Sequence, residues 1–157
     1  MKNILLLTLS LFLLSHASQA QDTHFFKGRV YAHEKKLKGT EVKVYRGKKA
    51  ISTYTTKRNG KFLFFPLAEA KYILEFSKPG YLTKRIMVNT ENTRGLEKDP
   101  ATYRFDITLK KDKAQNRAEY RDFPVAIIQY HPEKNEFGKS LRYQASLREN
   151  NNDLANK

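Results

Sequence analysis

The sequence predicts an all-β fold, a seven-stranded antiparallel β-sandwich, on two observations. Apolar and polar side chains alternate in seven short segments between residues 25 and 109, and a strand turns successive side chains to opposite faces. Turn residues separate these segments, and no helical pattern lies between them before residue 110. Parallel strands need long, usually helical crossovers, so we expect two antiparallel sheets packed face to face.

The first three strands follow from alternation and from glycine turns. Residues 26–33 alternate apolar side chains with charged or polar ones, and residues 42–45 do so again after a turn at Gly39. Gly47 marks the second turn. Residues 51–56, which follow it, are rich in Thr and Tyr and suit a half-exposed strand.

The next three strands are bounded by stronger turn signals. The Asn-Gly pair at 59–60 is the clearest hairpin marker in the chain, because both residues tolerate a positive φ. Residues 62–67 follow with two Phe on one face, and residues 72–76 alternate again. The Pro-Gly pair at 79–80 then predicts a turn before the strand at 82–88.

The seventh segment, residues 103–109, shows the strictest alternation and follows a polar connection at 89–101. Beyond it, residues 110–122 are charged and predict a linker or a short surface helix. We therefore divide the chain into a signal peptide (1–20), a sandwich domain (21–110) and a partly disordered C-terminal extension (111–157).

The N-terminus has the features of an export signal. Lys2 precedes an apolar run at 4–14, and the small residues Ser18 and Ala20 predict cleavage before Gln21. The alternative is a retained N-terminal anchor. The sequence holds no cysteine, so no lipid can be attached at the cleavage site. We expect an exported protein, periplasmic or secreted, that is not a lipoprotein and has no transmembrane segment after signal removal.

The charge balance favours anionic partners. The chain holds 30 Lys and Arg against 16 Asp and Glu, a formal net charge of +14. Such a charge speeds association with anionic surfaces. For an exported protein these are lipopolysaccharide, acidic glycans, anionic lipid or an acidic protein of the envelope, whereas nucleic acid does not fit this location. The alternative is a lysine-rich surface that serves only solubility.

The sequence shows no catalytic set, so we expect neither an enzyme nor a bound metal or cofactor. His24, His33 and His131 are far apart, and none has a carboxylate or cysteine at ligand spacing. No serine lies in a G-x-S-x-G setting. The alternative, a hydrolase of envelope polymer, requires a pocket that pairs titratable groups such as His33 with Glu34 or His131 with Glu133.

Basic residues cluster at three turns that are candidate contacts for an anionic partner. They are Lys35, Lys36 and Lys38, then Arg46, Lys48 and Lys49, and then Lys57, Arg58 and Lys61. Since alternate loops of a sandwich gather at one end, two clusters are expected to converge beside a tyrosine. Candidate tyrosines for stacking on a glycan are Tyr31, Tyr45 and Tyr54. The alternative is three independent solvated turns.

The extension contains two further candidate elements. Residues 123–130 are apolar, and Pro124 favours an edge strand. This strand either packs on its own domain or pairs with the sheet edge of a partner through Phe123, Val125, Ile127, Ile128 and Tyr130. Self-packing is favoured because exposed apolar strands aggregate. Residues 141–147 predict one or two helical turns, and residues 150–157 predict disorder.

Five motifs in order resemble a known family. They are GRV at 28–30, GTEVKV at 39–44, Thr56 with GKFLF at 60–64, YILEF at 72–76 and KPGY at 78–81. This succession resembles the carboxypeptidase regulatory-like domain of exported proteins from Bacteroidetes-type bacteria. The resemblance covers Phe25 to Leu109. One departure is Lys57, which stands where such domains often carry an acidic residue.

The resemblance implies an immunoglobulin-like or transthyretin-like (prealbumin-like) sandwich, a fold shared with carbohydrate-binding domains. It also implies a non-catalytic accessory module. We therefore expect a module that docks to an envelope protein or an anionic surface through its basic loops. A carbohydrate-binding module is the alternative, because fold similarity does not transfer function.

Overall fold

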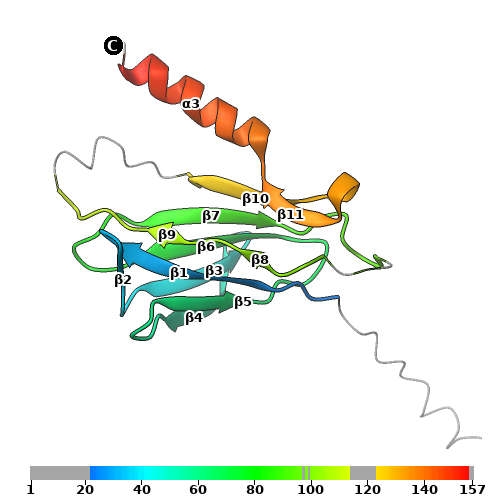
Figure 1. The fold of residues 1–157 in the computed structure, drawn as a ribbon, viewed down its shortest axis with the longest axis horizontal. Helices are drawn as coiled ribbons and strands as arrows, with labels where there is room; N and C mark the ends of the chain where they lie inside the picture. The colour runs from blue at the N-terminus through cyan, green and yellow to red at the C-terminus, as the bar shows by residue number, and fades with distance from the viewer. Residues whose placement is uncertain (1–21, 97, 99, 114–122, 156–157) are drawn as a thin grey trace, which may run out of the picture.

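Two mixed β-sheets pack face to face in the computed structural model, which describes residues 22–96, 98, 100–113 and 123–155 (Figure 1). The predicted all-β, immunoglobulin-like sandwich is therefore confirmed. The predicted signal peptide and most of the predicted linker at 110–122 lie outside the described residues.

The smaller sheet is built around one central strand, β1 (Phe26–Ala32). It pairs antiparallel with β2 (Lys35–Lys36) and β5 (Lys61–Phe64). On its other side it pairs in parallel with the short strands β8 (Tyr103–Arg104) and β9 (Ile107–Thr108). Strand β1, from the start of the domain sequence, therefore lies beside β8 and β9 from its end, and residues from both ends share one sheet surface.

The larger sheet has six strands in the order β11-β10-β7-β6-β3-β4. Their bounds are β3 (Glu41–Arg46), β4 (Lys49–Thr55), β6 (Lys71–Ser77), β7 (Lys84–Asn89), β10 (Ala126–His131) and β11 (Glu136–Lys139). Every neighbouring pair is antiparallel except β7 and β10, which run parallel.

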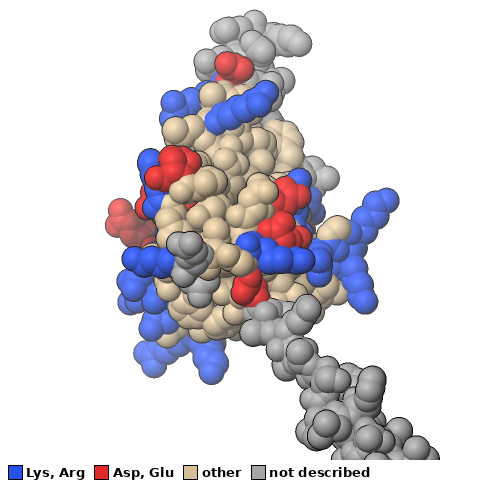
Figure 2. Space-filling view, turned by 90° about the vertical axis from the view of Figure 1, so that its right-hand side faces the viewer, with Lys and Arg blue, Asp and Glu red and all other residues tan. Residues whose placement is uncertain are grey.

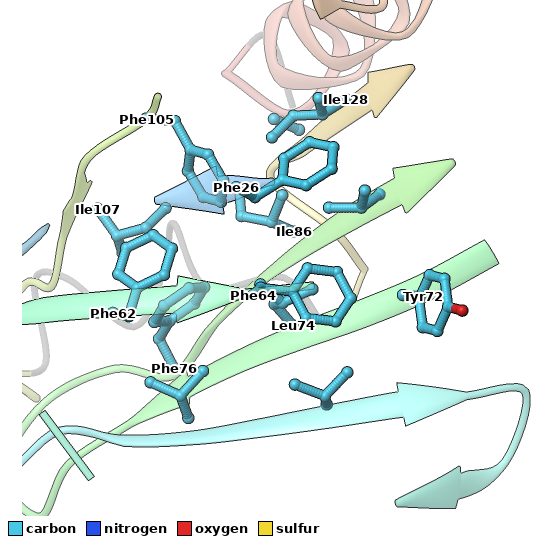
Figure 3. Close-up of a cluster of buried hydrophobic side chains, with 14 of the residues drawn as sticks. Phe26, Phe62, Phe64, Tyr72, Leu74, Phe76, Ile86, Phe105, Ile107 and Ile128 are labelled. Atoms are coloured by element: carbon cyan, nitrogen blue, oxygen red, sulfur yellow. The ribbon is translucent and has the colours of Figure 1, made fainter. Parts of the chain in front are cut away.

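The core is a layer of aromatic and aliphatic side chains between the two sheets (Figure 3). Phe62 of β5 meets Phe76 of β6 edge to face, with ring centroids 5.0 Å apart. Phe26 of β1 is fully buried, as is Leu74 of β6. Each such side chain contributes about 1.5–3 kcal/mol by leaving water, so burial can hold the fold without disulfides.

The expectation of purely antiparallel sheets is wrong. Parallel neighbours need a long connection, and here the strands of the opposite sheet provide it in place of a helix. The chain leaves β7, passes through β8 and β9 in the smaller sheet, and returns to the larger sheet as β10. The seventh predicted strand is also interrupted, since β8 and β9 are separated at Phe105 and Asp106.

The Asn-Gly pair at 59–60 does not form the predicted hairpin, because β4 and β5 belong to different sheets. The turn instead carries the chain across the sandwich. Gly60 has φ of +66°. A Cβ at this position would lie 2.6 Å from the carbonyl oxygen of Val30. The glycine is therefore required by close backbone approach as well as by its φ.

The C-terminal segment completes the larger sheet. Strand β10 lies between β7 and β11 and is not the expected edge strand, and Pro124 precedes it. A short 3-10 helix, η1 (Pro132–Lys134), connects β10 to β11.

Helix α3 (Leu141–Ala155) follows β11 and extends away from the sandwich (Figure 1). Its 15 residues exceed the predicted one or two turns. The expected disorder is wrong for residues 150–155, which are helical. Among the described residues, no helix has the length and apolar character needed to cross a membrane.

Candidate anion-binding site

The outer face of the smaller sheet brings cationic side chains from three strands side by side. On β1, Lys27 and Arg29 point away from the core because Phe26 and Val30 point into it. Lys27 pairs with Arg104 of β8, and Arg29 pairs with Lys61 of β5. Strand pairing thus places four cations from distant parts of the sequence on one surface.

This surface forms part of a hollow of about 900 Å³. We call it the basic hollow, and its lining residues are Lys27, Gly28, Arg29, Tyr54, Thr55, Lys57, Asn59, Lys61, Phe62, Leu63, Arg104, Phe105 and Asp106. Five of them are Lys or Arg, and one is acidic. Figure 2 shows Lys and Arg side chains standing out from the rim of the molecule, grouped most closely at the lower left.

The single carboxylate of the basic hollow is held by the backbone. Oδ1 of Asp106 accepts a hydrogen bond from the backbone N–H of Arg29 at 2.8 Å. Next to this bond, the backbone N–H of Phe105 donates to the carbonyl of Lys27. A Cβ at Gly28 would lie 1.6 Å from the Phe105 carbonyl oxygen, so only glycine fits where β1 passes next to Phe105.

Arg29 keeps an unused donor. Its Nε is buried, and in the described part of the chain it has no hydrogen-bond partner. A guanidinium presents its donors in a fixed fork that matches phosphate and carboxylate groups. Because this Nε is buried, a shift of the Arg29 side chain is needed before the unpaired donor can reach an anion at the basic hollow.

Tyr54 closes one side of the basic hollow. Its Oη donates a hydrogen bond of 2.8 Å to the carbonyl of Leu63, which joins β4 of the larger sheet to β5 of the smaller one. Burial raises the pKa of Tyr54 to about 12. The hydroxyl therefore stays neutral at physiological pH and adds no negative charge to the site.

Two of the three predicted basic clusters lie at the same end of the sandwich. Oγ1 of Thr56 donates to the carbonyl of Leu37, and the N–H of Gly39 donates to the carbonyl of Thr56. These bonds hold the turn with Lys35, Lys36 and Lys38 against the turn with Lys57 and Arg58. Of these residues, Lys57 lines the basic hollow together with Lys61.

The third cluster, Arg46, Lys48 and Lys49, lies at the opposite end of the larger sheet. The register of β3 and β4 shows this, because Glu41 pairs with Thr55 at one end and Arg46 pairs with Lys49 at the other. The three clusters do not form one surface.

The three candidate tyrosines do not form a row. Tyr31 lies on β1 and lines a second hollow of about 430 Å³, whereas Tyr45 lies on β3 of the larger sheet. Only Tyr54 lines the basic hollow, and its hydroxyl is already bonded to Leu63. The structure thus lacks the stacking platform that the glycan hypothesis required of these three residues.

The alternative in which residues 123–130 pair with the sheet edge of a partner is wrong, because β10 is paired on both sides by β7 and β11. Ile128 is 1% exposed and belongs to the core, Ile127 and Tyr130 are partly buried, and Phe123 and Val125 lie before β10. The segment packs on its own domain, the use that the sequence favoured.

The residue pairs of the hydrolase alternative lie at one turn and at the end of β10, where His131 is followed by Glu133 of η1. His33 and Glu34 form the tip between β1 and β2 and line the second hollow. Nδ1 of His131 lies 3.5 Å from Oε1 of Glu133. Within the described ranges, no three His, Asp or Glu side chains gather closely enough to hold a metal ion.

Sequence reasoning missed Lys27, Arg29, Arg104 and Asp106 as site residues. Alternation does place Lys27 and Arg29 on the polar face of their strand, and Arg104 and Asp106 on the polar face of theirs. A polar strand face is usually only solvated, however. The missing fact is that these two strands are neighbours, which depends on long-range pairing.

Comparison with known proteins does not identify a family. Neither a protein-family model nor a curated protein matches the sequence. The chain is similar to solved structures of a catechol 1,2-dioxygenase mutant from Acinetobacter radioresistens (15% identity, TM-score 0.48, 71% of this chain and 59% of that one) and of the group B streptococcus pilus 2b backbone protein (12%, 0.39, 56% and 41%). It is also similar to S.CueP (17%, 0.38, 59% and 65%).

The chain spans about three fifths of two further solved structures, a 3-chlorocatechol and a catechol 1,2-dioxygenase. At these identities the likeness concerns the fold alone.

Proposed function

We propose that this protein is an exported, non-catalytic accessory module of the cell envelope that binds an anionic partner through the basic hollow. One observation carries the proposal. Five cationic side chains from β1, β5, β8 and one loop line a single hollow, and the only carboxylate among the lining residues is engaged with the backbone of Arg29.

The physical basis is the concentration of like charge. Cations gathered in one concave region focus a positive potential, which raises the local concentration of anions and their association rate. Charge-assisted hydrogen bonds from Arg29 and Arg104 would then hold the bound group. The net charge of +14 supports attraction at longer range.

The sequence resemblance fits the same role. Two glycines of its motifs, Gly28 and Gly60, lie where a Cβ would meet backbone oxygens of neighbouring segments. These glycines serve the fold, and we propose that the cations of the basic hollow serve recognition. We propose a carboxypeptidase regulatory-like domain in this accessory role, with an acidic envelope protein or an anionic envelope surface as partner.

The test measures binding of the exported chain, residues 21–157, to dextran sulfate as a soluble polyanion. Binding is compared at about 0.1 M and about 1 M salt, between which the Debye length falls from about 10 Å to about 3 Å. We expect binding at low salt that is lost at high salt. Binding that does not change with ionic strength, or no binding at low salt, would overturn the proposal.

A matched pair of triple variants locates the site. The variant Arg29→Gln/Lys61→Gln/Arg104→Gln should weaken binding about a hundredfold, since each charge-assisted contact contributes about 1.5–3 kcal/mol and losses of neighbours do not add fully. The control Arg46→Gln/Lys48→Gln/Lys49→Gln removes equal charge at the far end of β3 and β4 and should weaken binding less than threefold, roughly. Equal losses in the two variants would show that net charge alone is responsible.

A further inference from the structure

The outer face of the smaller sheet is basic over its middle and apolar at one end. Phe25 precedes β1 and Phe65 follows β5, and their rings lie 4.8 Å apart. Phe65 is 58% exposed, and its strand neighbour Leu63 is 48% exposed. Leu63 also pairs with Lys27, so the apolar end adjoins the basic hollow directly.

The apolar and basic parts of this face touch one another. Nζ of Lys27 lies 5.4 Å from the centroid of the Phe25 ring, an attractive cation–π arrangement. Leu63 lines the basic hollow, and Phe65 is the next outward residue of the same segment. One continuous surface therefore offers an aromatic pair beside a group of cations.

We propose that this face docks on an anionic phospholipid bilayer, with lipid phosphates in the basic hollow and the Phe25–Phe65 pair in the interfacial layer. The inference rests on the proposed function and names the partner. Aromatic rings favour the boundary between headgroups and acyl chains. Basic side chains favour the negative surface potential of anionic leaflets.

The apolar end distinguishes a bilayer from a soluble polyanion. A soluble polyanion would neutralise Lys27, Arg29 and Lys61 but would leave the Phe65 ring in water, because Phe65 does not line the basic hollow. A bilayer satisfies both parts of the face at once, because its phosphates and its apolar layer lie at adjacent depths.

The test compares vesicles of phosphatidylcholine alone with vesicles that also contain phosphatidylglycerol, in a flotation assay with residues 21–157. We expect binding only to the anionic vesicles. Phe65→Ser should weaken vesicle binding about tenfold, the effect of losing insertion of one ring, and should leave dextran sulfate binding unchanged. Ile51→Ser, at a residue 49% exposed on β4 of the larger sheet, is the control and should change neither.

Three outcomes separate this inference from the proposed function. Binding to dextran sulfate without binding to anionic vesicles would overturn the lipid inference and leave the proposed function standing. Vesicle binding that Phe65→Ser and Ile51→Ser affect equally would also overturn it. Binding to neither probe would overturn both proposals.

Discussion

The carboxylate of Asp106 accepts the backbone N–H of Arg29 at 2.8 Å, although the two residues lie 77 positions apart in the sequence. The bond replaces a strand-to-strand bond, because Asp106 occupies the break between β8 and β9 where the ladder beside β1 is interrupted. The same carboxylate is the single negative charge lining the basic hollow. Asp106 therefore links the architecture of the smaller sheet to the charge of the site.

The first prediction separates these two roles of Asp106. Asp106→Asn keeps an oxygen that accepts the Arg29 N–H but removes the charge. We expect nearly unchanged stability and a roughly threefold to tenfold increase in affinity for dextran sulfate at low salt, because one repulsive charge has left the hollow. Urea unfolding and titration calorimetry measure the two effects.

Asp106→Ala is the matched comparison. It removes the charge and the acceptor together, so it should also lower the free energy of unfolding by about 1 kcal/mol. If Asp106→Asn destabilised the protein as much as Asp106→Ala, the charge of the carboxylate and not its acceptor oxygen would be what holds the strands.

Much of the core could be predicted from the sequence, because alternation depends on neighbours along the chain. Phe26, Val30, Phe62 and Phe76 are buried as their patterns predict. Strand pairing is decided by contacts across the molecule. The sequence therefore could not reveal that residues 103–108 run parallel to β1.

The dependence of strand pairing on long-range contacts also explains why the sequence did not predict the basic hollow. The sequence drew attention to basic residues in turns, and only Lys57 and Lys61 of those line the basic hollow. The other three cations, Lys27, Arg29 and Arg104, lie on β1 and β8. A charged side chain on a strand indicates only a solvated face until the pairing of the strands is known. Charge clusters within one turn are visible in a sequence, whereas clusters across a sheet are not.

The second prediction concerns the C-terminal segment. Phe137 of β11 is 5% exposed, and its ring lies 4.8 Å from that of Phe26 in the smaller sheet. Phe137→Ala should lower the free energy of unfolding by about 3–5 kcal/mol, the usual effect of removing a buried phenylalanine side chain. Leu141→Ala, at a residue 80% exposed, should change stability by less than about 0.5 kcal/mol.

Urea unfolding of the two variants measures this difference. A small decrease in the free energy of unfolding for Phe137→Ala would mean that the sandwich is stable without β10 and β11. A large loss would place the domain boundary after β11, beyond the position near residue 110 that composition suggested.

The third prediction concerns backbone strain at the tip between β1 and β2. His33 and Glu34 have φ of +46° and +64°, and both central positions of this two-residue turn therefore lie in the left-handed region. Asn-Gly is the pair that suits such a turn. His33→Asn/Glu34→Gly should raise the free energy of unfolding by about 1 kcal/mol, because the strain is relieved.

The control is His33→Ala/Glu34→Ala, which removes the same side chains but keeps non-glycine residues at both positions. It should not stabilise the protein in thermal unfolding. Equal stabilisation by both double variants would assign the effect to the lost side chains and not to the backbone.

The fourth prediction is a pH dependence that arises at Glu69. Its Oε1 accepts the backbone N–H groups of Thr93 at 2.8 Å and Arg94 at 3.0 Å. These bonds, first from Thr93 and then from Arg94, lower the pKa of Glu69 below its ordinary 4.5. A carboxyl whose pKa is lower in the folded state stabilises the fold above its unfolded pKa, and this stabilisation is lost as the pH falls through the folded value.

Glu69→Gln keeps an acceptor oxygen but cannot ionise, so it removes only the part of the stability that depends on pH. The wild-type protein should therefore exceed the variant in urea midpoint at about pH 7, and the difference should be smaller at about pH 3, because the stabilisation is lost as the pH falls below the ordinary pKa of 4.5 and through the lower folded pKa. Measuring both midpoints at both pH values tests this. A difference that stayed constant down to the lower pH would show that the amide, not the lost charge, accounts for the change at the loop after β7.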